Sequence, residues 1–223
     1  MKWNFKRDIF PLSMILILLV ICGYFYGKLP QIIPSHFNAK GLPDNYSSKD
    51  SMILISIASS IGLYLILTFI PMIDPFWKRI EKKYDIFLLF RDLTVAFIVF
   101  IFFLTFISAK EGTFRSDLFG YGFGLLFILL GNYLPKLPRN FFFGIRSPWT
   151  LASEVVWKKT HRIGGAFFVV GGILLILLTL LKVELIISIF VILIPLVLYT
   201  AFIYPYMLFK KLQKQGDIKT PDL

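Results

Sequence analysis

Apolar residues are concentrated in six long runs along the chain, with few charged side chains inside them. The runs cover residues 9–27, 52–73, 86–109, 118–134, 163–181 and 185–209. A helix needs about 20 predominantly apolar residues to cross the hydrocarbon core of a bilayer, so each run is long enough for one crossing. The pattern therefore predicts an all-α, polytopic membrane protein, a bundle of six transmembrane helices.

The composition supports this fold class and narrows the chemistry. Of the 223 residues, 57% are hydrophobic and 17% are charged, whereas soluble domains usually have about 25% charged residues. This excludes a disordered chain and an ordinary soluble enzyme. The single cysteine, Cys22, excludes a disulfide scaffold, and one cysteine with two distant histidines does not supply the about four ligands of a structural zinc site. We expect no metal site and no cofactor.

The net charge of +11 is distributed unevenly between alternating loops. Of the 24 Lys and Arg residues, 17 lie in the N-terminus, loops 74–85 and 135–162 and the C-terminal tail, while six lie in the other three loops. Basic residues accumulate on the cytoplasmic side of membrane proteins. The bias predicts that both termini are cytoplasmic, and it explains the charge without direct nucleic-acid binding.

Small residues and one proline predict how the spans pack. The fourth run contains Gly120 and Gly124 in a G-x-x-x-G spacing, which lets two helix backbones approach closely. The fifth run repeats paired glycines at 164–165 and 171–172. Pro195, in the middle of the last run, predicts a kink in that helix.

The first loop, 28–51, is rich in proline and is named the Pro-rich loop. Its prolines stop the first helix, and turns are expected at 38–41 and at 43–44. We expect the loop to lie over the extracellular mouth of the bundle, either as a structural cap or as a docking surface. The candidate residues are Pro30, Pro34, His36, Phe37, Asn38, Gly41, Pro43 and Asp44.

The loop at 132–162, named the motif loop, combines arginines with aromatic residues. Ser147-Pro148 predicts a helix start, and we expect a short helix over 148–160. Glu154 and Lys158 are spaced for an i,i+4 ion pair. Trp149, Val156 and Trp157 indicate that this helix lies along the cytoplasmic interface. Arg139 and Arg146 either clamp an anionic group, such as a lipid phosphate, or only anchor the loop.

The third apolar run contains two adjacent charges, Arg91 and Asp92. They lie close to one end of the run, so Arg91 is expected to reach the interface and Asp92 to pair with a cation on another helix. The alternative role for this pair is a proton relay.

Two motifs resemble a known family. The run from Leu29 to Asp44 is similar to the N-terminal domain of unknown function found in SdpI-type membrane proteins. The motif loop resembles the signature of the SdpI family itself. The matching residues there are Asn132, Pro135, Arg139, Asn140, Gly144, Arg146, Pro148, Trp149, Thr150, Glu154, Trp157, Thr160, His161 and Arg162.

The resemblance implies a membrane protein of Gram-positive bacteria that confers immunity to a secreted peptide toxin, the sporulation delay protein. It also implies signalling, in which a cytoplasmic transcriptional repressor is held at the membrane, and no enzymatic activity or cofactor. The expected partners are the toxin, the repressor and membrane lipids. We expect a two-span N-terminal unit over 1–75 and a four-span unit over 76–223.

Two other functions stay open from the residues alone. A proton-coupled transporter would use Arg91 and Asp92, which would need a water-filled path to them. A lipid-modifying enzyme would use Arg139, Arg146, Glu154 and His161, although the expected nucleophile or metal cluster is missing from the sequence.

Overall fold

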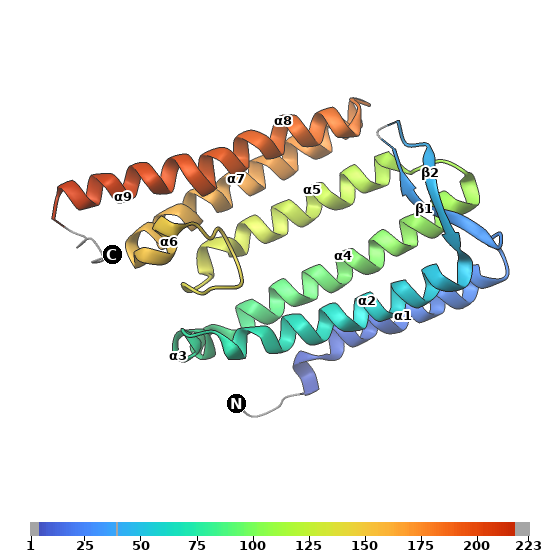
Figure 1. Cartoon of the computed structure of the whole chain (residues 1–223), viewed down its shortest axis with the longest axis horizontal. Helices are drawn as coiled ribbons and strands as arrows, with labels where there is room; N and C mark the ends of the chain where they lie inside the picture. Colours follow the sequence, from blue (N-terminus) through green and yellow to red (C-terminus); the bar gives the residue numbers. More distant parts are fainter. Residues whose placement is uncertain (1–4, 39, 217–223) are drawn as a thin grey trace.

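A computed structural model describes residues 5–38 and 40–216 of the chain. Within these ranges it contains six helices long and apolar enough to cross a membrane, which confirms the predicted all-α multi-pass architecture (Figure 1). Lys2 and Lys219, which entered the charge count, lie outside the described residues.

The six spans have the following bounds. The first four are α1 (Ile9–Tyr26), α2 (Lys49–Phe69) continued by the 3-10 turn η2 (Ile70–Ile73), α4 (Tyr84–Glu111) and α5 (Ser116–Tyr133). The last two are α7 (Glu154–Leu180) and a composite of α8 (Leu185–Val197), the π-helical η5 (Leu198–Ile203) and α9 (Tyr204–Lys214). The short elements are η1 (Phe5–Arg7), α3 (Trp77–Ile80), η3 (Glu81–Lys83), η4 (Leu134–Lys136) and α6 (Pro148–Ala152).

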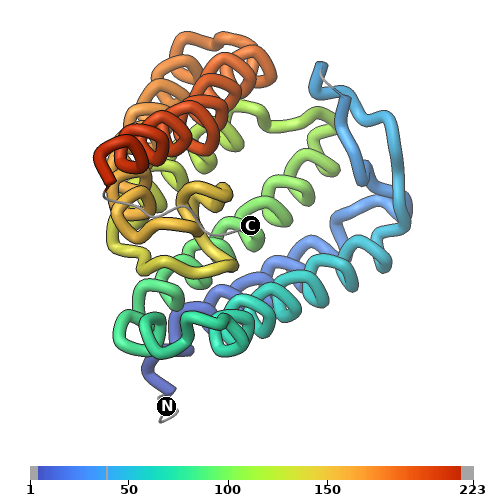
Figure 2. The backbone as a smooth tube through the Cα atoms, turned by 60° about the vertical axis from the view of Figure 1, so that its left-hand side comes forward, coloured from blue at the N-terminus to red at the C-terminus, as the bar shows by residue number. Residues whose placement is uncertain are grey.

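Helix α4 lies between two groups of helices (Figures 1 and 2). Helices α1 and α2 pack on one side of it, and α5 packs on the other side, followed by α7 and α8. Phe97 of α4 stacks on Phe123 of α5, with ring centroids 5.8 Å apart. The bundle therefore has two halves that meet along α4 and α5.

The Pro-rich loop folds as a β-hairpin, which the sequence did not predict. Strand β1 (Ile32–Phe37) pairs antiparallel with β2 (Pro43–Ser48). The turn predicted at 38–41 is confirmed: Asn38 Oδ1 accepts the Lys40 and Leu42 N–H groups at 2.9 and 3.1 Å, and Gly41 has a φ of 72°. The turn predicted at 43–44 is wrong, because these residues begin β2.

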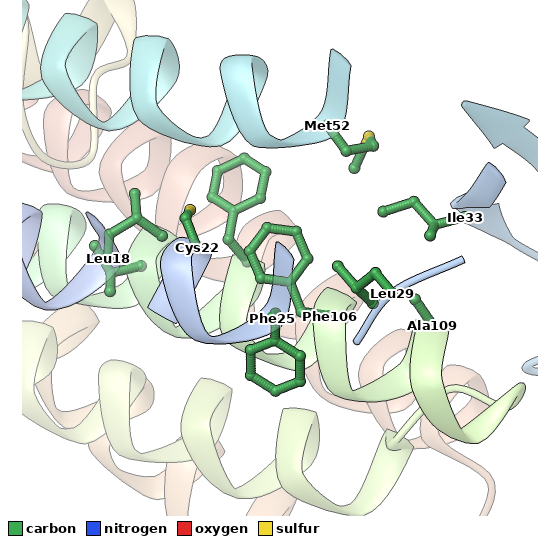
Figure 3. Packing of buried hydrophobic residues seen from close by; sticks show 10 residues of the cluster. Leu18, Cys22, Phe25, Leu29, Ile33, Met52, Phe106 and Ala109 are labelled. Carbon is green, nitrogen blue, oxygen red and sulfur yellow. The ribbon is translucent and has the colours of Figure 1, made fainter. Parts of the chain in front are cut away.

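The hairpin covers one end of the bundle, which we call the hairpin end. Leu29 and Ile33 at its base are buried against Met52 of α2 and against Phe106 and Ala109 of α4 (Figure 3). This apolar cluster continues into the bundle through α1. The opposite end carries α3, α6 and the motif loop, and we call it the motif-loop end (Figure 1).

Helices α5 and α7 make the closest contact, and glycines account for it as predicted. Gly124 lies against the Gly172 carbonyl and Gly131 against the Gly165 carbonyl. A Cβ built on Gly131 would lie 2.7 Å from the Gly165 oxygen, which is closer than van der Waals packing allows. The two pairs are spaced alike on the antiparallel helices, so the backbones touch over two turns.

The last span departs from α-helical geometry after Pro195. Proline lacks the N–H that would bond to the preceding turn. Residues Leu198–Ile203 form a π-helical segment, and Thr200 within it is buried and bonds to the Leu196 carbonyl at 2.7 Å. The sequence predicted a kink at Pro195, and the structure has a π-helical segment that begins three residues later.

We predict that Gly165→Ala destabilises the protein by about 1–3 kcal/mol, the usual cost of overpacking. The added Cβ would lie 2.6 Å from the Gly131 oxygen, and a backbone atom cannot move aside cheaply. Thermal unfolding of the detergent-purified protein, followed by near-UV circular dichroism, measures the effect. The control is Gly23→Ala in α1, where a Cβ has nothing within 4 Å. Equal melting temperatures for the two variants would contradict the close α5–α7 contact.

Candidate functional site

A cleft of about 820 Å³ opens at the hairpin end. Three segments line it: the hairpin tip (35–38 and 40–42), the α4–α5 connection with the start of α5 (113–119), and the α7–α8 turn (179–189). The Phe114 N–H donates to the Gly41 carbonyl at 3.3 Å, which ties the hairpin tip to the α4–α5 connection. The cleft therefore lies between the hairpin and the tip of the α7–α8 pair.

Aromatic side chains form a row along one wall of this cleft. The Phe37 and Phe114 rings have centroids 5.2 Å apart, and Phe114 and Phe119 follow at 5.8 Å. Ile186 and Ile189 of α8 also line the cleft, and Leu42 at the hairpin tip is 51% exposed. This lining suits an apolar ligand at the membrane surface.

Charged groups surround the apolar lining. A guanidinium nitrogen of Arg115 lies 3.0 Å from a carboxylate oxygen of Asp117. The Asp117 carboxylate raises the pKa of the Arg115 guanidinium above its ordinary value. Three further charged residues line the cleft: Lys40, Lys182 and Glu184. None of them forms an ion pair with another residue in the described parts of the chain, 5–38 and 40–216.

The candidate residues of the Pro-rich loop separate into two groups. His36, Phe37, Asn38 and Gly41 line the cleft. Pro34 is buried in the hairpin, and Pro30, Pro43 and Asp44 lie outside the lining. His36 Nδ1 lies 2.5 Å from Asp44 Oδ1, so these two side chains brace the strands against each other.

At the motif-loop end, the side chains of Trp157 and His161 are buried and stack on each other. The Trp157 indole N–H donates to the Leu137 carbonyl at 2.9 Å, and its ring stacks on His161 with centroids 4.0 Å apart. His161 Nε2 accepts the Ile145 N–H at 3.0 Å, and Nδ1 lies 2.9 Å from the Trp157 carbonyl. This pattern requires a neutral imidazole with its proton on Nδ1. Nε2 thereby holds Ile145 against α7, while Nδ1 fixes the ring on its own helix.

The predicted helix over 148–160 is wrong in its extent. Ser147 caps α6 through a reciprocal capping box with Thr150, so the predicted start is confirmed, but α6 ends at Ala152. Ser153 is extended (φ −137°, ψ 127°) and caps α7, which begins at Glu154. The residues from Glu154 onward are the first turns of the fifth span.

The predicted interfacial position is wrong for Val156 and Trp157, which are fully buried. They face inward because they lie on the side of α7 that packs against the motif loop and α9. Trp149 is half-buried and packs on Tyr206 of α9, with ring centroids 5.3 Å apart. Helix α6 is thereby attached to the last span.

Arg139 and Arg146 are both engaged by the loop itself. Arg139 donates to the Leu151 carbonyl at 3.1 Å and lies 3.6 Å from Glu154. Arg146 is exposed and donates to the Phe141 carbonyl at 2.6 Å. These contacts favour the anchoring alternative over the anion clamp.

The Glu154 carboxylate lies near several basic side chains at this end. It pairs with Arg79 at 3.0 Å and, as predicted, with Lys158 at 3.5 Å. Among the hydrogen bonds of the described chain, none joins Glu154 to His161, the arrangement that a lipid-modifying enzyme would need.

Two buried polar side chains order the motif loop, one within the loop and one from the end of α2. The Asn140 side chain accepts the Phe142 and Phe143 N–H groups at 2.9 and 2.6 Å. Asp74, which the sequence did not single out, accepts the Phe141 N–H at 2.6 Å and so joins the loop to the end of α2. Nothing in the sequence around Asp74 distinguished it from other acidic loop residues, so its role could not be predicted.

The remaining motif residues have mixed positions. Gly144 has a φ of 94°, and a side chain there would collide with the His161 imidazole. Thr160 is buried, and its hydroxyl has no hydrogen-bond partner in the described part of the chain. Asn132, Pro135, Pro148 and Arg162 are exposed.

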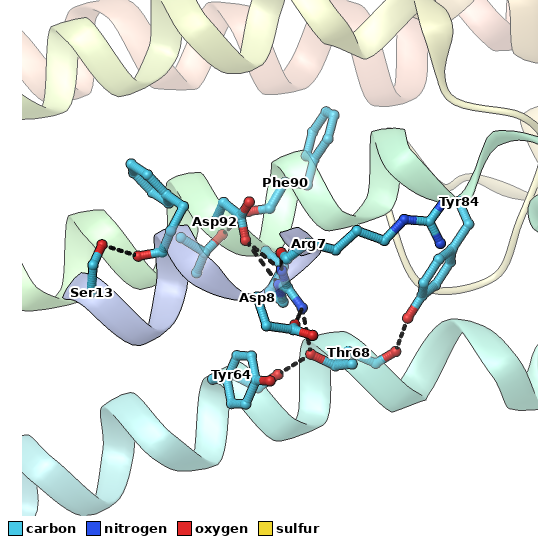
Figure 4. A network of polar contacts seen from close by, with 11 residues as sticks. Arg7, Asp8, Ser13, Tyr64, Thr68, Tyr84, Phe90 and Asp92 are labelled. Atoms are coloured by element: carbon cyan, nitrogen blue, oxygen red, sulfur yellow. Dashed lines mark hydrogen bonds and ion pairs between the residues drawn. The ribbon is translucent and has the colours of Figure 1, made fainter. Parts of the chain in front are cut away.

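Arg91 is fully buried, so the prediction that it reaches the interface is wrong. Figure 4 shows the side chains of Asp8, Thr68 and Asp92 pointing toward one another in this polar network. Its guanidinium pairs with Asp8 at 2.7 Å and Asp92 at 2.8 Å, and it donates to the Thr68 hydroxyl at 3.1 Å and the Arg7 carbonyl at 2.7 Å. Asp92 therefore pairs with its chain neighbour and not with a cation on another helix. These contacts favour a structural ion pair over a proton relay.

With this geometry described, the fold and the site define a class: a six-span membrane protein with a β-hairpin cap at one end and a buried, aromatic-rich loop at the other. The model of the SdpI/YfhL protein family matches residues 136–208, and the model of the domain of unknown function DUF1648 matches residues 14–59. The chain is therefore similar to the SdpI/YfhL family over residues 136–208 and to DUF1648 over residues 14–59.

A curated relative extends this likeness over almost the full length of the chain. The chain is 26% identical over 208 residues to "Immunity protein SdpI" of Bacillus subtilis (strain 168), which covers 93% of this chain and 98% of that protein. No solved structure gives a significant match.

We predict that Arg91→Leu lowers stability by about 3–5 kcal/mol, because it leaves the Asp8 and Asp92 carboxylates buried without a cation. The expected result is a large loss of folded protein in membranes and a lower melting temperature in detergent. The control is Arg79→Ala, whose ion pair with Glu154 is half-exposed and contributes about 0–1 kcal/mol. A melting temperature for Arg91→Leu equal to that of Arg79→Ala would show that the buried pair has no stabilising role.

Proposed function

We propose that this protein confers resistance on a bacterial cell to a secreted antimicrobial peptide toxin of the sporulation-delay (SdpC-like) type. It acts by binding and not as an enzyme. The observation that carries the proposal is the likeness to an immunity protein over 93% of the chain. The cleft at the hairpin end supplies a surface on which such a peptide could bind.

The proposed orientation puts this cleft outside the cell. Loops at the motif-loop end and both termini carry 17 of the 24 Lys and Arg residues, and basic residues accumulate on the cytoplasmic side. Both termini are then cytoplasmic, and the hairpin is extracellular. A secreted toxin reaches the cleft without crossing the membrane.

The two ends are assigned to two units. The unit 1–75 contains the DUF1648 match and supplies the hairpin, while the unit 76–223 contains the SdpI match and supplies the motif loop. In this proposal the toxin meets the hairpin end. A cytoplasmic repressor and the inner lipid surface meet the exposed residues of the motif loop, among them Arg146 and Arg162.

The test is survival of a toxin-sensitive bacterium that expresses this protein, exposed to a panel of secreted peptide toxins that includes the sporulation delay toxin. We expect the wild type to protect. We expect Leu42→Asp to abolish most of the protection, because it introduces a charge into the apolar cleft. The matched control is Tyr46→Asp, since Tyr46 is 56% exposed on the same hairpin but does not line the cleft.

One outcome would contradict the proposed immunity, and another would move the protective site to the other end of the protein. No protection against any toxin of the panel would count against immunity. Loss of protection in Arg146→Ala, with Leu42→Asp still protective, would place the protective step at the motif loop. Membrane levels of each variant, measured by immunoblot, separate these results from poor insertion.

A further inference from the structure

The cleft at the hairpin end has two lysines on opposite sides. Lys40 lies at the hairpin tip and Lys182 in the α7–α8 turn, and both are exposed. The Asp117 carboxylate of the lining is neutralised by its ion pair with Arg115. Glu184 is the remaining acidic group of the lining, so the unpaired charge of the cleft is positive on balance.

Lys182 occupies a backbone position that normally selects glycine. Its φ is 57°, and every other positive-φ residue of the described chain is glycine. The turn closes α7 with two hydrogen bonds, from the Lys182 N–H to Thr179 and from the Val183 N–H to Leu178, both 3.0 Å. Glycine is favoured at this point of a helix end, since a side chain is strained there. The chain thus keeps a cationic side chain at the cleft against a local conformational preference.

From these observations we infer that the cleft takes an apolar peptide segment that carries a free carboxylate, bound between Lys40 and Lys182. The apolar part lies along the row Phe37, Phe114 and Phe119, and the carboxylate is neutralised at the mouth. A terminal carboxylate or an acidic side chain meets this requirement equally. The inference rests on the proposed function and specifies the ligand chemistry of that cleft.

A peptide fits this lining better than a lipid. The cleft has a volume of about 820 Å³ and combines a row of aromatic side chains with charges of both signs. The Glu184 carboxylate can accept hydrogen bonds from peptide N–H groups, which a phosphodiester lacks. Lysine binds either anion as a point charge. Occupation by an anionic lipid is therefore an outcome that the experiment has to distinguish.

The test measures binding of the fluorescently labelled sporulation delay toxin to the protein in nanodiscs of zwitterionic lipid. The variants are Lys182→Gly, Lys182→Arg and Lys182→Glu, with Lys110→Gly as a control lysine outside the cleft lining. A second probe is the same toxin with its carboxyl groups converted to amides. Melting temperatures are recorded for every variant.

We expect Lys182→Gly to raise the melting temperature, because glycine relieves the strained turn, and yet to weaken toxin binding about threefold, the effect of one exposed ion pair. Lys182→Glu weakens it further, Lys182→Arg restores it, and Lys110→Gly leaves it unchanged. The amidated toxin binds the wild type as weakly as the unmodified toxin binds Lys182→Gly. A structural role alone would not produce higher stability together with weaker binding.

Three results would overturn the inference, and they are distinguishable. If the wild type binds the toxin but Lys182→Gly and the amidated probe bind equally well, the carboxylate is not recognised, while the proposed function stands. If adding anionic lipid to the nanodiscs displaces the toxin from the wild type but not from Lys182→Gly, the site belongs to a lipid. If the wild type does not bind the toxin, the proposed function fails and the inference fails with it.

Discussion

The buried guanidinium of Arg91 is the interaction on which the first half of the protein depends. It joins Asp8 before α1, Thr68 of α2 and Asp92 of α4, so one side chain fixes three helices. A single cation between two carboxylates in a low-dielectric interior tolerates little displacement, because each partner left unpaired is costly. Tyr84 adds a hydrogen bond from its hydroxyl to the Thr68 carbonyl at 2.5 Å. The same three helices support the hairpin at their far end.

The second half is held by a different kind of contact. Helices α5 and α7 touch through their backbones at Gly124, Gly131, Gly165 and Gly172, where dispersion and close approach replace ion pairing. The halves meet through phenylalanines of α4 and α5. The cleft at the hairpin end lies between these two halves, since the hairpin extends from the first and the α7–α8 turn belongs to the second.

The sequence was sufficient for the spans and for the glycine contact, because apolar length and small-residue spacing are local properties. It was insufficient for the partner of Arg91, since Asp8 lies outside every apolar run and is 83 positions away. The hairpin was missed because its strands mix prolines with polar residues and do not alternate clearly. The cleft could not be predicted, since its lining comes from three distant segments. In the motif loop, Trp157 and His161 were identified from the sequence, but Trp157 was expected at the interface, although an i,i+4 pair on a helix can equally face inward.

The π-helical segment after Pro195 has a consequence for the rotational phase of the last span. A π-helical turn takes one residue more than an α-helical turn, so every residue after it is rotated by roughly 100° relative to an uninterrupted helix. Leu196 of α8 and Phe209 of α9 both lie against α7. On an uninterrupted α-helix these two positions would point to different sides. A helical wheel drawn across the whole run would assign these residues to the wrong face. The π-helical segment thereby lets α9 pack against α7 and α6 while α8 also packs against α7.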